Sequence, residues 1–250
     1  MKRAERLESI LGLLSTEGSV AVSDLTGRLR ASAATVRRDL ELLEEQKLLS
    51  RTHGGAVGNG TLYELPVRYR GGQHASEKRR IAETAVARIG DARTVGLTGG
   101  TTTTEVARRL RNRELTVVTN AVNIASELVV SSTIRLVVTG GVARPQSYEL
   151  IGPLADATLG GLNLDLLFIG VDGATPEGMT THDELEAQTD RRMVERAKRV
   201  IVVCDSSKIG RAALSVICRA EQVDALITDS EARPDDVAAL TEAGIAVDTV

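Results

Sequence analysis

The sequence predicts an α/β protein in two parts: a short front part of three helices and a hairpin, then a larger α/β part with a mainly parallel sheet covered by helices. Three observations lead to this prediction. Apolar residues recur at helical spacing at the front, residues 58–75 break all periodicity with glycine and proline, and seven short β-rich runs alternate with helical ones beyond them. We therefore expect a domain at 1–58, a linker at 59–75 and a second domain at 76–250.

Composition places the chain among soluble globular proteins. Of its 250 residues 42% are apolar, enough for a sizeable core, and no run of about 18 apolar residues could cross a membrane. Met1 is followed by a charged helical pattern rather than by the apolar run of a signal peptide, so we expect a cytoplasmic location. Cys204 and Cys218 lie outside CxxC spacing, and three scattered histidines complete no ligand cluster. We expect reduced, buried cysteines, no bound metal and no cofactor.

The front part has the pattern of three short helices in succession. Apolar residues at helical spacing run from Leu7 to Leu14, and Gly18 ends that helix. A second short stripe runs from Val22 to Leu29. Only about three residues around Ala31 separate the second helix from the third, which is typical of a helix-turn-helix whose second element reads DNA.

The third helix carries the candidate reading surface. Ser32 can cap it through its hydroxyl, and its buried stripe is Val36, Leu40 and Leu43. On a helical wheel Arg38 falls opposite this stripe with Ala34 beside it, while Thr35 and Arg37 occupy the flanks. An arginine in this place can reach guanine edges, and Thr35 can reach a phosphate. A solvated amphipathic helix with an ordinary arginine pair explains the same pattern when the helix is considered alone.

The next segment favours the DNA-binding interpretation. LLSRTHGGAV predicts a strand, a tight His-Gly-Gly turn and a second strand, a wing that carries Arg51 and His53 towards a duplex backbone. Residues 1–60 hold nine Lys and Arg against eight Asp and Glu, net +1, and the rest of the chain has net −4. Three helices followed by a basic hairpin predict a winged helix-turn-helix domain.

Residues 35–56, TVRRDLELLEEQKLLSRTHGGA, resemble the signature of the DeoR family of bacterial transcription regulators. The match is specific because helix, wing and glycines appear in order. Arg30 and Lys47 depart from it, since they stand where that family often has glycine, and they put the local turn geometry in doubt. The candidate DNA-binding residues are Ser32, Ala34, Thr35, Arg37, Arg38, Arg51 and His53.

The larger part has nearly continuous apolar runs separated by helical ones. The runs are TVGLT, LTVVTN, IRLVVTGG, DLLFIGVDG, RVIVVCD, DALITD and IAVDT. This alternation predicts a parallel sheet covered on both faces, and in such sheets ligands bind beyond the carboxyl ends of the strands. The strands end in polar residues or glycine, so this edge is the predicted ligand site.

The stretch TGGTTTTEVARRL lies at one of these strand ends and opens a helix. The glycines allow close approach, and the backbone N–H groups and threonine hydroxyls can surround a phosphate. It is not a Walker loop, because no Gly-Lys-Ser/Thr follows, and it lacks GxGxxG. A small phosphorylated ligand therefore fits better than a nucleotide. Threonines that merely cap the helix are the alternative.

The motifs of this part, in order, resemble the effector-sensing domain of the same family, which is similar in fold to ribose phosphate isomerase. They are EKRRIA, TGGTTTTEVARRL, VVTNAVNIA, VVTGG, the Glu186-Ala187 pair and CDSSKIG. The resemblance implies that the loop holds the phosphate of a phosphorylated sugar and that further residues line the pocket. The implied effector-binding residues are Lys78, Gly99, Gly100, Thr101, Thr102, Thr103, Asn120, Asp172, Glu186 and Lys208. Thr98 stands where the family commonly has Asp, and Asp190 where it commonly has Lys, so the ligand can differ from the usual ones.

Three functions fit these features. We favour a transcription regulator, most often a repressor in this family, whose affinity for double-stranded operator DNA is altered by a phosphorylated sugar or related metabolite. A homo-oligomer, dimer or tetramer, is expected because helix-turn-helix proteins bind paired half-sites. A sugar phosphate isomerase would use Asp172 or Glu186 as its base, but it has no use for a reading helix. A DNA-binding module that responds to a partner protein is the third possibility.

Overall fold

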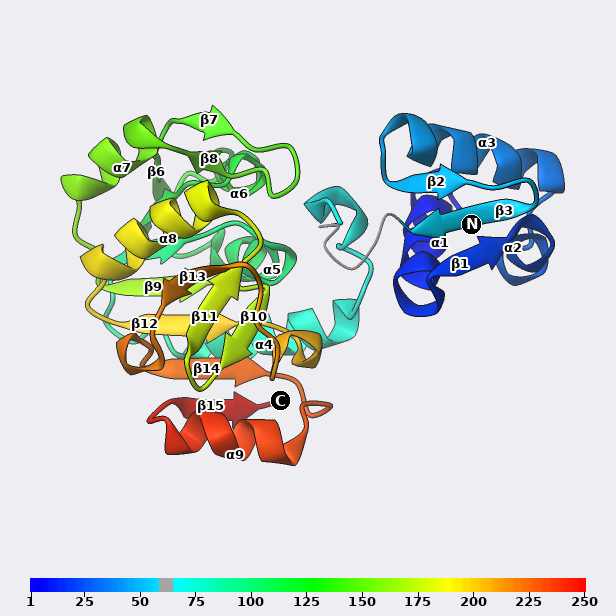
Figure 1. The fold of residues 1–250 in the computed structure, drawn as a ribbon. Helices are drawn as coiled ribbons and strands as arrows, with labels where there is room; N and C mark the ends of the chain where they lie inside the picture. The colour runs from blue at the N-terminus through cyan, green and yellow to red at the C-terminus, as the bar shows by residue number, and fades with distance from the viewer. Residues whose placement is uncertain (59–64) are drawn as a thin grey trace. The chain divides into compact units, whose positions relative to one another are not determined.

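The computed structural model describes residues 1–58 and 65–250, and it divides into two compact units, Met1–Gln73 and His74–Val250 (Figure 1). Of the expected linker at 59–75, residues 59–64 lie outside the described residues. Residues 65–73 belong to the first unit. Within the described residues, no helix is both long and apolar enough to cross a membrane.

The first unit consists of three helices and a small antiparallel sheet. Its elements are α1 (Arg3–Glu17), β1 (Ser19–Ala21), α2 (Val22–Leu29), α3 (Ala33–Glu45), β2 (Leu49–Arg51) and β3 (Gly55–Gly58). The three predicted helices and the predicted hairpin are confirmed. The sheet order is β1-β3-β2, so the hairpin gains a third strand that the sequence analysis did not predict. Three residues are too few to show an alternating pattern.

The apolar stripes of the helices form one core in this unit. Leu25, Leu40 and Leu43 are fully buried in it, and Tyr69 of the short 3-10 helix η1 (Val67–Tyr69) packs against the same cluster. The Tyr69 hydroxyl donates a hydrogen bond of 2.7 Å to the Gln46 side chain, just after α3. The chain that leaves the wing thus returns to the end of the third helix.

The two departures from the family signature both adopt left-handed backbone. Arg30 has φ 49° at the end of α2, and Lys47 has φ 58° just after α3. This region suits glycine, and it costs an L-residue roughly 1–2 kcal/mol. The turns therefore keep the geometry that glycine would give them, at a cost in conformational strain.

A seven-stranded parallel sheet forms the centre of the second unit. Its strands are β4 (Thr94–Leu97), β5 (Leu115–Thr119), β6 (Ile134–Val138), β9 (Leu166–Ile169), β12 (Val200–Val203), β14 (Ala225–Thr228) and β15 (Ala246–Thr249). Their order is β15-β14-β12-β9-β4-β5-β6, and every pair is parallel. All seven runs expected from the sequence are strands of this one sheet, so the predicted fold class is confirmed.

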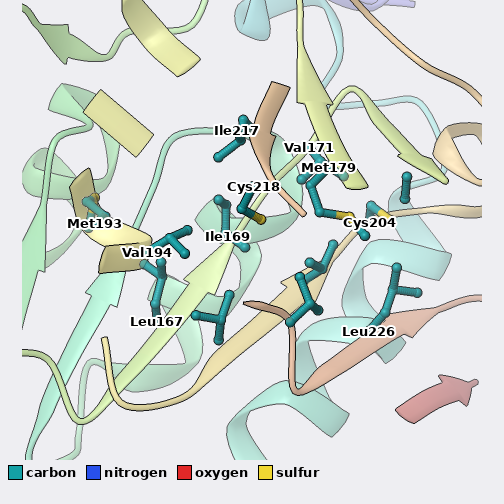
Figure 2. Close-up of a cluster of buried hydrophobic side chains, with 14 of the residues drawn as sticks. Leu167, Ile169, Val171, Met179, Met193, Val194, Cys204, Ile217, Cys218 and Leu226 are labelled. Atoms are coloured by element: carbon teal, nitrogen blue, oxygen red, sulfur yellow. The ribbon is translucent and has the colours of Figure 1, made fainter. Parts of the chain in front are cut away.

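Alternation along β9 shows how the sheet is covered on both faces. Leu166 and Phe168 pack into the cluster formed with α4 (Ala75–Ala87), α5 (Thr101–Leu110) and α6 (Val122–Leu128). Leu167 and Ile169 pack into the opposite cluster, part of which Figure 2 shows, with residues of α7 (Pro153–Gly160), α8 (Glu184–Arg196) and α9 (Pro234–Glu242). A strand buried on both sides has no polar face, which explains its continuous apolar run.

Two smaller sheets add to this core. β10 (Gly173–Thr175), β11 (Gly178–Thr181) and β13 (Ser215–Cys218) form an antiparallel sheet, and β7 (Val142–Ala143) pairs with β8 (Leu150–Ile151). Cys204 and Cys218 are buried and free, as predicted, and burial raises the pKa of the Cys218 thiol to about 12.

Candidate functional site

The third helix begins at its predicted cap. The Ser32 hydroxyl accepts a hydrogen bond of 3.2 Å from the Thr35 backbone N–H, and the two hydroxyl oxygens are 2.9 Å apart. Ala34, Arg37 and Arg38 are exposed, and Thr35 is partly buried. The predicted reading surface of α3 is therefore open to solvent, opposite the buried leucine stripe.

The sequence analysis missed a buried carboxylate in α3. Asp39 is only 1% exposed, and it pairs with the Arg6 side chain of α1, whose Nη2 lies 3.2 Å from Asp39 Oδ1. The hydrogen bond to Asp39 raises the pKa of the Arg6 guanidinium above its ordinary value. The pair fixes the rotation of α3 against α1, and so it sets which side chains face outward. An acidic residue beside the apolar stripe at Val36 and Leu40 was the available signal.

Both predicted residues of the wing, Arg51 and His53, are exposed. The Arg51 backbone N–H donates a hydrogen bond of 2.9 Å to Glu44, and its guanidinium lies 3.9 Å from the same carboxylate. Gly55 follows the turn. A Cβ atom at this position would lie 1.9 Å from the Val20 carbonyl oxygen, so only glycine lets the hairpin pack on β1.

The glycine-threonine loop connects β4 to α5 in the second unit. Gly100 has φ 124°, which favours glycine, and it precedes the first turn of α5. The hydroxyls of Thr103 and Thr104 donate to the Gly100 carbonyl at 3.1 and 2.6 Å. These two threonines therefore stabilise the turn by bonding back to its carbonyl; neither caps the helix, because no side chain accepts a hydrogen bond at its N-cap, Gly100.

The first two threonines of α5 are arranged differently. Among the described residues, no hydrogen bond involves the Thr101 or Thr102 hydroxyl. The backbone N–H groups of the first turn also have no partner within the helix, and together they form a favourable site for an anion. The loop thus combines two threonines whose hydroxyls bond the Gly100 carbonyl with two, Thr101 and the buried Thr102, whose hydroxyls have no partner among the described residues.

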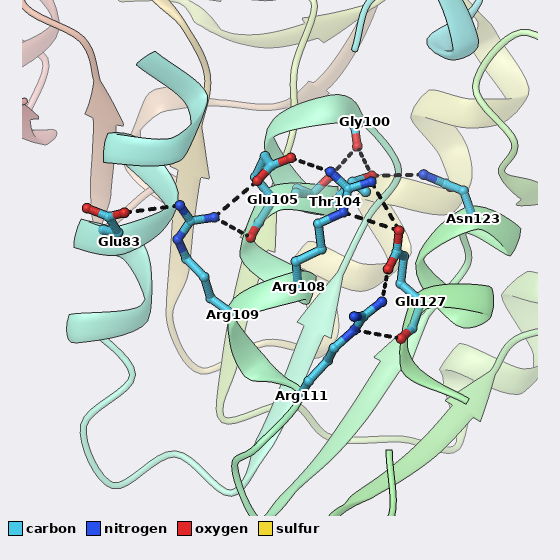
Figure 3. A network of polar contacts seen from close by, with 10 residues as sticks. Glu83, Gly100, Thr104, Glu105, Arg108, Arg109, Arg111, Asn123 and Glu127 are labelled. Carbon is cyan, nitrogen blue, oxygen red and sulfur yellow. Dashed lines mark hydrogen bonds and ion pairs between the residues drawn. The ribbon is translucent and has the colours of Figure 1, made fainter. Parts of the chain in front are cut away.

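The outer side of α5 is anchored to both neighbouring helices (Figure 3). Arg109 lies 3.1 Å from Glu83 of α4, and Arg108 lies 3.0 Å from Glu127 of α6. Asn123 of α6 donates a hydrogen bond of 2.8 Å to the Thr104 hydroxyl. Asn123 therefore holds the start of α5, and the ion pairs of Arg108 and Arg109 hold its last turn.

A chain of polar contacts connects three other strand and helix ends. Lys208 lies 3.4 Å from Asp172, which follows β9. The Thr181 hydroxyl lies 3.2 Å from Asp172 and 2.8 Å from Glu186 in the first turn of α8. Arg144 lies 3.2 Å from the other oxygen of Glu186. The predicted residues Asp172, Glu186 and Lys208 thus belong to one connected group.

Asn120 lies at the centre of a buried acidic cluster. Its Nδ2 is 3.1 Å from a Glu149 oxygen and 3.4 Å from an Asp190 oxygen. Glu149, Glu186 and Asp190 can place one carboxylate oxygen each within 4.8 Å of one another, and all three side chains are buried. Asp190, where the family commonly has Lys, is one of the three.

The Glu149 carboxylate also touches the loop before α5. A Cβ atom on Gly99 would lie 2.3 Å from Glu149 Oε1 and 2.5 Å from its Cγ, so the Glu149 side chain packs directly against the Gly99 backbone. A β-bridge between Ala121 and Glu149 places this carboxylate beside Asn120, and Tyr148 before it has φ 63°. Through Glu149 the acidic cluster reaches the predicted phosphate loop.

The cluster changes the protonation of two of its members. Burial and the nearby charges of Asp190 and Glu186 hold the pKa of Glu149 well above its usual range. Burial and the charge of Glu186 do the same to the pKa of Asp190. Carboxylates with strongly perturbed pKa values cluster at functional sites, which makes this group a candidate site.

Lys78 forms a second buried ion pair near the edge of the sheet. Its Nζ lies 3.7 Å from Asp205, which follows β12, and both side chains are about 95% buried. Burial raises the pKa of Asp205, but hydrogen bonding to Ser207 and the charges of Lys78 and Lys208 outweigh it and lower that pKa overall.

The sequence analysis therefore missed several residues of this region. Glu149 and Arg144 lie in an irregular segment between β7 and β8, and Thr181 ends β11, so none of them stands at a predicted strand end. The earlier expectation of no metal considered cysteine and histidine, whereas the cluster consists of carboxylates. Only the chain fold brings Glu149 to Asn120.

Two domain models of one protein family match the chain. Residues 6–61 match the DeoR-like helix-turn-helix domain, and residues 73–230 match the DeoR C terminal sensor domain. A protein of Escherichia coli O157:H7 named as a candidate aga operon transcriptional repressor is 37% identical over 98% of this chain and 93% of its own. The glycerol-3-phosphate regulon repressor of Escherichia coli K12 is 33% identical over 92% of each chain.

A solved structure gives a weaker likeness. Ribose 5-phosphate isomerase A from Methanocaldococcus jannaschii aligns with a TM-score of 0.41 at 18% identity, over 60% of this chain and 58% of that one. A likeness at this level supports no statement about activity.

Proposed function

Because this chain belongs to the DeoR family of DNA-binding transcription regulators, we propose that it represses genes of carbohydrate metabolism and that a phosphorylated sugar changes its operator affinity. The observation that carries the proposal is the presence in one chain of an exposed arginine face on α3 and a glycine-threonine loop whose backbone N–H groups at the start of α5 have no partner within the helix. Relatives named as repressors of the aga operon and of the glycerol-3-phosphate regulon support the choice of carbohydrate genes.

The DNA contact is assigned to α3 and the wing. Arg38 is exposed and lies opposite the buried stripe, so its guanidinium can form two hydrogen bonds to a guanine edge. Arg51 in the wing is placed for a phosphate, and it exchanges its contact with Glu44 for that phosphate. The two arginines thus have different roles, one in base recognition and one in positioning.

DNA binding is tested by fluorescence anisotropy on an operator selected from random duplexes. Arg38→Ala should weaken the specific duplex by about 1–3 kcal/mol and leave binding to random DNA nearly unchanged. Arg51→Ala should weaken both and reduce the salt slope by about one unit. Arg192→Ala on α8, an exposed arginine of the second unit, is the matched control and should change neither. Equal loss for Arg38→Ala on both duplexes contradicts base recognition.

The effector contact is assigned to the first turn of α5. The free N–H groups and the hydroxyls of Thr101 and Thr102 suit a phosphate dianion, and Lys78 and Lys208 are the cationic groups among the residues assigned to the pocket. A phosphorylated sugar should therefore bind more tightly than its unphosphorylated parent. If both bind alike, the phosphate assignment is wrong.

Calorimetric titration of sugar phosphates tests this assignment. Thr102→Val keeps the side-chain shape, and it should weaken the ligand by about 1–3 kcal/mol through the loss of one hydrogen bond to a charged group. Thr241→Val on α9 is the control, since its hydroxyl bonds only within that helix. Operator DNA must change the ligand affinity by the same factor by which the ligand changes operator affinity.

The same titrations separate a sensor from an isomerase. An isomerase would convert the bound sugar phosphate with Asp172 or Glu186 as base, and operator affinity would not respond to the ligand. Proton NMR measures whether the protein converts the sugar phosphate into its isomer. Conversion together with an operator affinity that the ligand does not change would contradict the regulator and support the isomerase.

A further inference from the structure

The buried acidic cluster beside Asn120 carries one further inference, which does not depend on which effector binds. We infer that the carboxylates of Glu149, Glu186 and Asp190, together with the side-chain oxygen of Asn120, form a binding site for a hard divalent cation such as Mg²⁺, Mn²⁺ or Ca²⁺. Neither the family assignment nor the proposed sensing of a sugar phosphate requires such an ion.

The spacing of the carboxylates suits a single ion. Each of the three residues offers an oxygen within 4.8 Å of the others. Oxygen ligands lie roughly 2.0–2.6 Å from Mg²⁺ or Ca²⁺, so two ligands on opposite sides of the ion are about 4–5 Å apart. Three oxygens within 4.8 Å of one another lie at most about 2.8 Å from a common centre, so small side-chain movements bring all three to coordination distance.

The charge of the cluster also favours a cation. Glu149 and Asp190 are each only 2% exposed, and among the described residues neither forms an ion pair with a lysine, arginine or histidine. Their shared polar side-chain partner is the neutral amide of Asn120. Two like charges in a dry site are costly unless a cation or protons neutralise them.

Asn120 supplies an independent observation. Its side chain is fully buried, and its Nδ2 contacts both Glu149 and Asp190, yet its Oδ1 has no hydrogen-bond partner among the described residues. A buried acceptor without a partner is rare and costs about 1–3 kcal/mol. Without a cation, Nδ2 donates to the two carboxylates; with a cation in the cluster, a half turn of the amide would exchange these two hydrogen bonds for a contact between Oδ1 and the ion.

The donor set defines the class of ion. Three carboxylates and one amide oxygen form an all-oxygen site, which suits Mg²⁺, Mn²⁺ or Ca²⁺. The nearby cysteine of β13 is not part of the group. Arg144 contacts Glu186 from outside the cluster, and it shares that carboxylate with the ion rather than replacing it.

Titration of the full-length protein with Mn²⁺ tests the site, with no sugar phosphate and no DNA present. Free Mn²⁺ is counted by electron paramagnetic resonance at pH 7.5. We expect one strong site per chain, and Asp190→Asn should weaken it at least tenfold while raising the melting temperature without metal, because it removes one of three like charges. Glu195→Gln, at an exposed carboxylate of the same helix that pairs with Arg192 and lies outside the trio, should leave Mn²⁺ binding unchanged.

Three results would overturn the inference. The first is the absence of Mn²⁺ binding at millimolar concentration, and the second is binding that Asp190→Asn leaves unchanged. The third concerns Mn²⁺-free protein: it binds an amino-sugar phosphate more tightly than the hydroxyl analogue, and the Asp190→Asn variant loses this preference. The cation of the cluster would then be the ammonium group of the ligand and not a metal ion. None of these results affects the test of phosphate sensing, which compares phosphorylated with plain sugars.

Discussion

Gly99→Ala probes the contact between the loop and Glu149. A Cβ atom at Gly99 would lie 2.3 Å from Oε1 and 2.5 Å from Cγ of Glu149, about an ångström closer than ordinary van der Waals contact. Glu149 cannot swing into solvent, because it is buried against Asn120 and the other acids. Overpacking of this kind costs about 1–3 kcal/mol, and we expect that loss in the unfolding free energy of the second unit.

The loss of unfolding free energy in Gly99→Ala should disappear when the Glu149 side chain is removed. In a Glu149→Ala background the added methyl group meets no carboxylate, so Gly99→Ala should be neutral or stabilise by about 0.4–1 kcal/mol through the unfolded chain. Gly160→Ala, at a glycine of α7 with open space around its Cβ, is the matched control and should not destabilise.

Cysteine reactivity measures the unfolding free energy of the second unit in the parent protein, in Gly99→Ala and Glu149→Ala, and in the double variant. Cys204 and Cys218 are both buried in the second unit, so their alkylation in increasing urea reports its unfolding and not that of the first unit. Thiols that are buried with a raised pKa react only after opening. A cost of Gly99→Ala that persists unchanged without Glu149 would refute the assigned contact.

Three further predictions follow from single contacts. Lys47→Gly removes the strain of a lysine at φ 58° and should stabilise the first unit by about 0.5–1 kcal/mol, measured by hydrogen exchange of α3; a faster exchange would contradict this. Asp39→Asn breaks the pair with Arg6 and should destabilise the same unit by about 2 kcal/mol; unchanged exchange of α3 would show that the pair contributes nothing. Hydrogen bonds from Lys198 and two backbone N–H groups lower the pKa of Asp165 to about 2, so its stabilisation is present above about pH 4 and is lost as the pH falls towards 2. Asp165→Asn should flatten that acid dependence of unfolding, and an identical profile would remove Asp165 as its source.

The sequence predicted the large elements because their patterns are local. The leucine stripes of the first three helices and the apolar runs of the seven parallel strands each lie within one segment, so they appear in the amino-acid order itself. β1 and the β7–β8 hairpin are only two or three residues long, and their pairing depends on segments distant in the sequence. Such strands leave no periodic signal.

The candidate site was predictable only where it coincides with strand ends. Asn120 directly follows β5 and Asp172 comes three residues after β9, so the rule for parallel sheets finds them. Glu149 lies after an irregular segment, and nothing in its neighbours shows that it will be buried beside Asn120. A charge reversal at Asp190 was visible in the sequence, but its meaning depends on Glu149, which only the fold supplies.

The position of Tyr69 has a mechanical consequence. Its hydroxyl is bound to Gln46 at the end of the third helix, and nine positions later Lys78 is buried in the first turns of α4 against Asp205. Nine residues span at most about 30 Å when fully extended, so the connection between Tyr69 and Lys78 is short. We expect a ligand that shifts Lys78 to pull on the end of the third helix through this connection. Glycine and serine residues inserted between Gln73 and His74 should then reduce the ligand's influence on DNA while leaving each separate affinity unchanged.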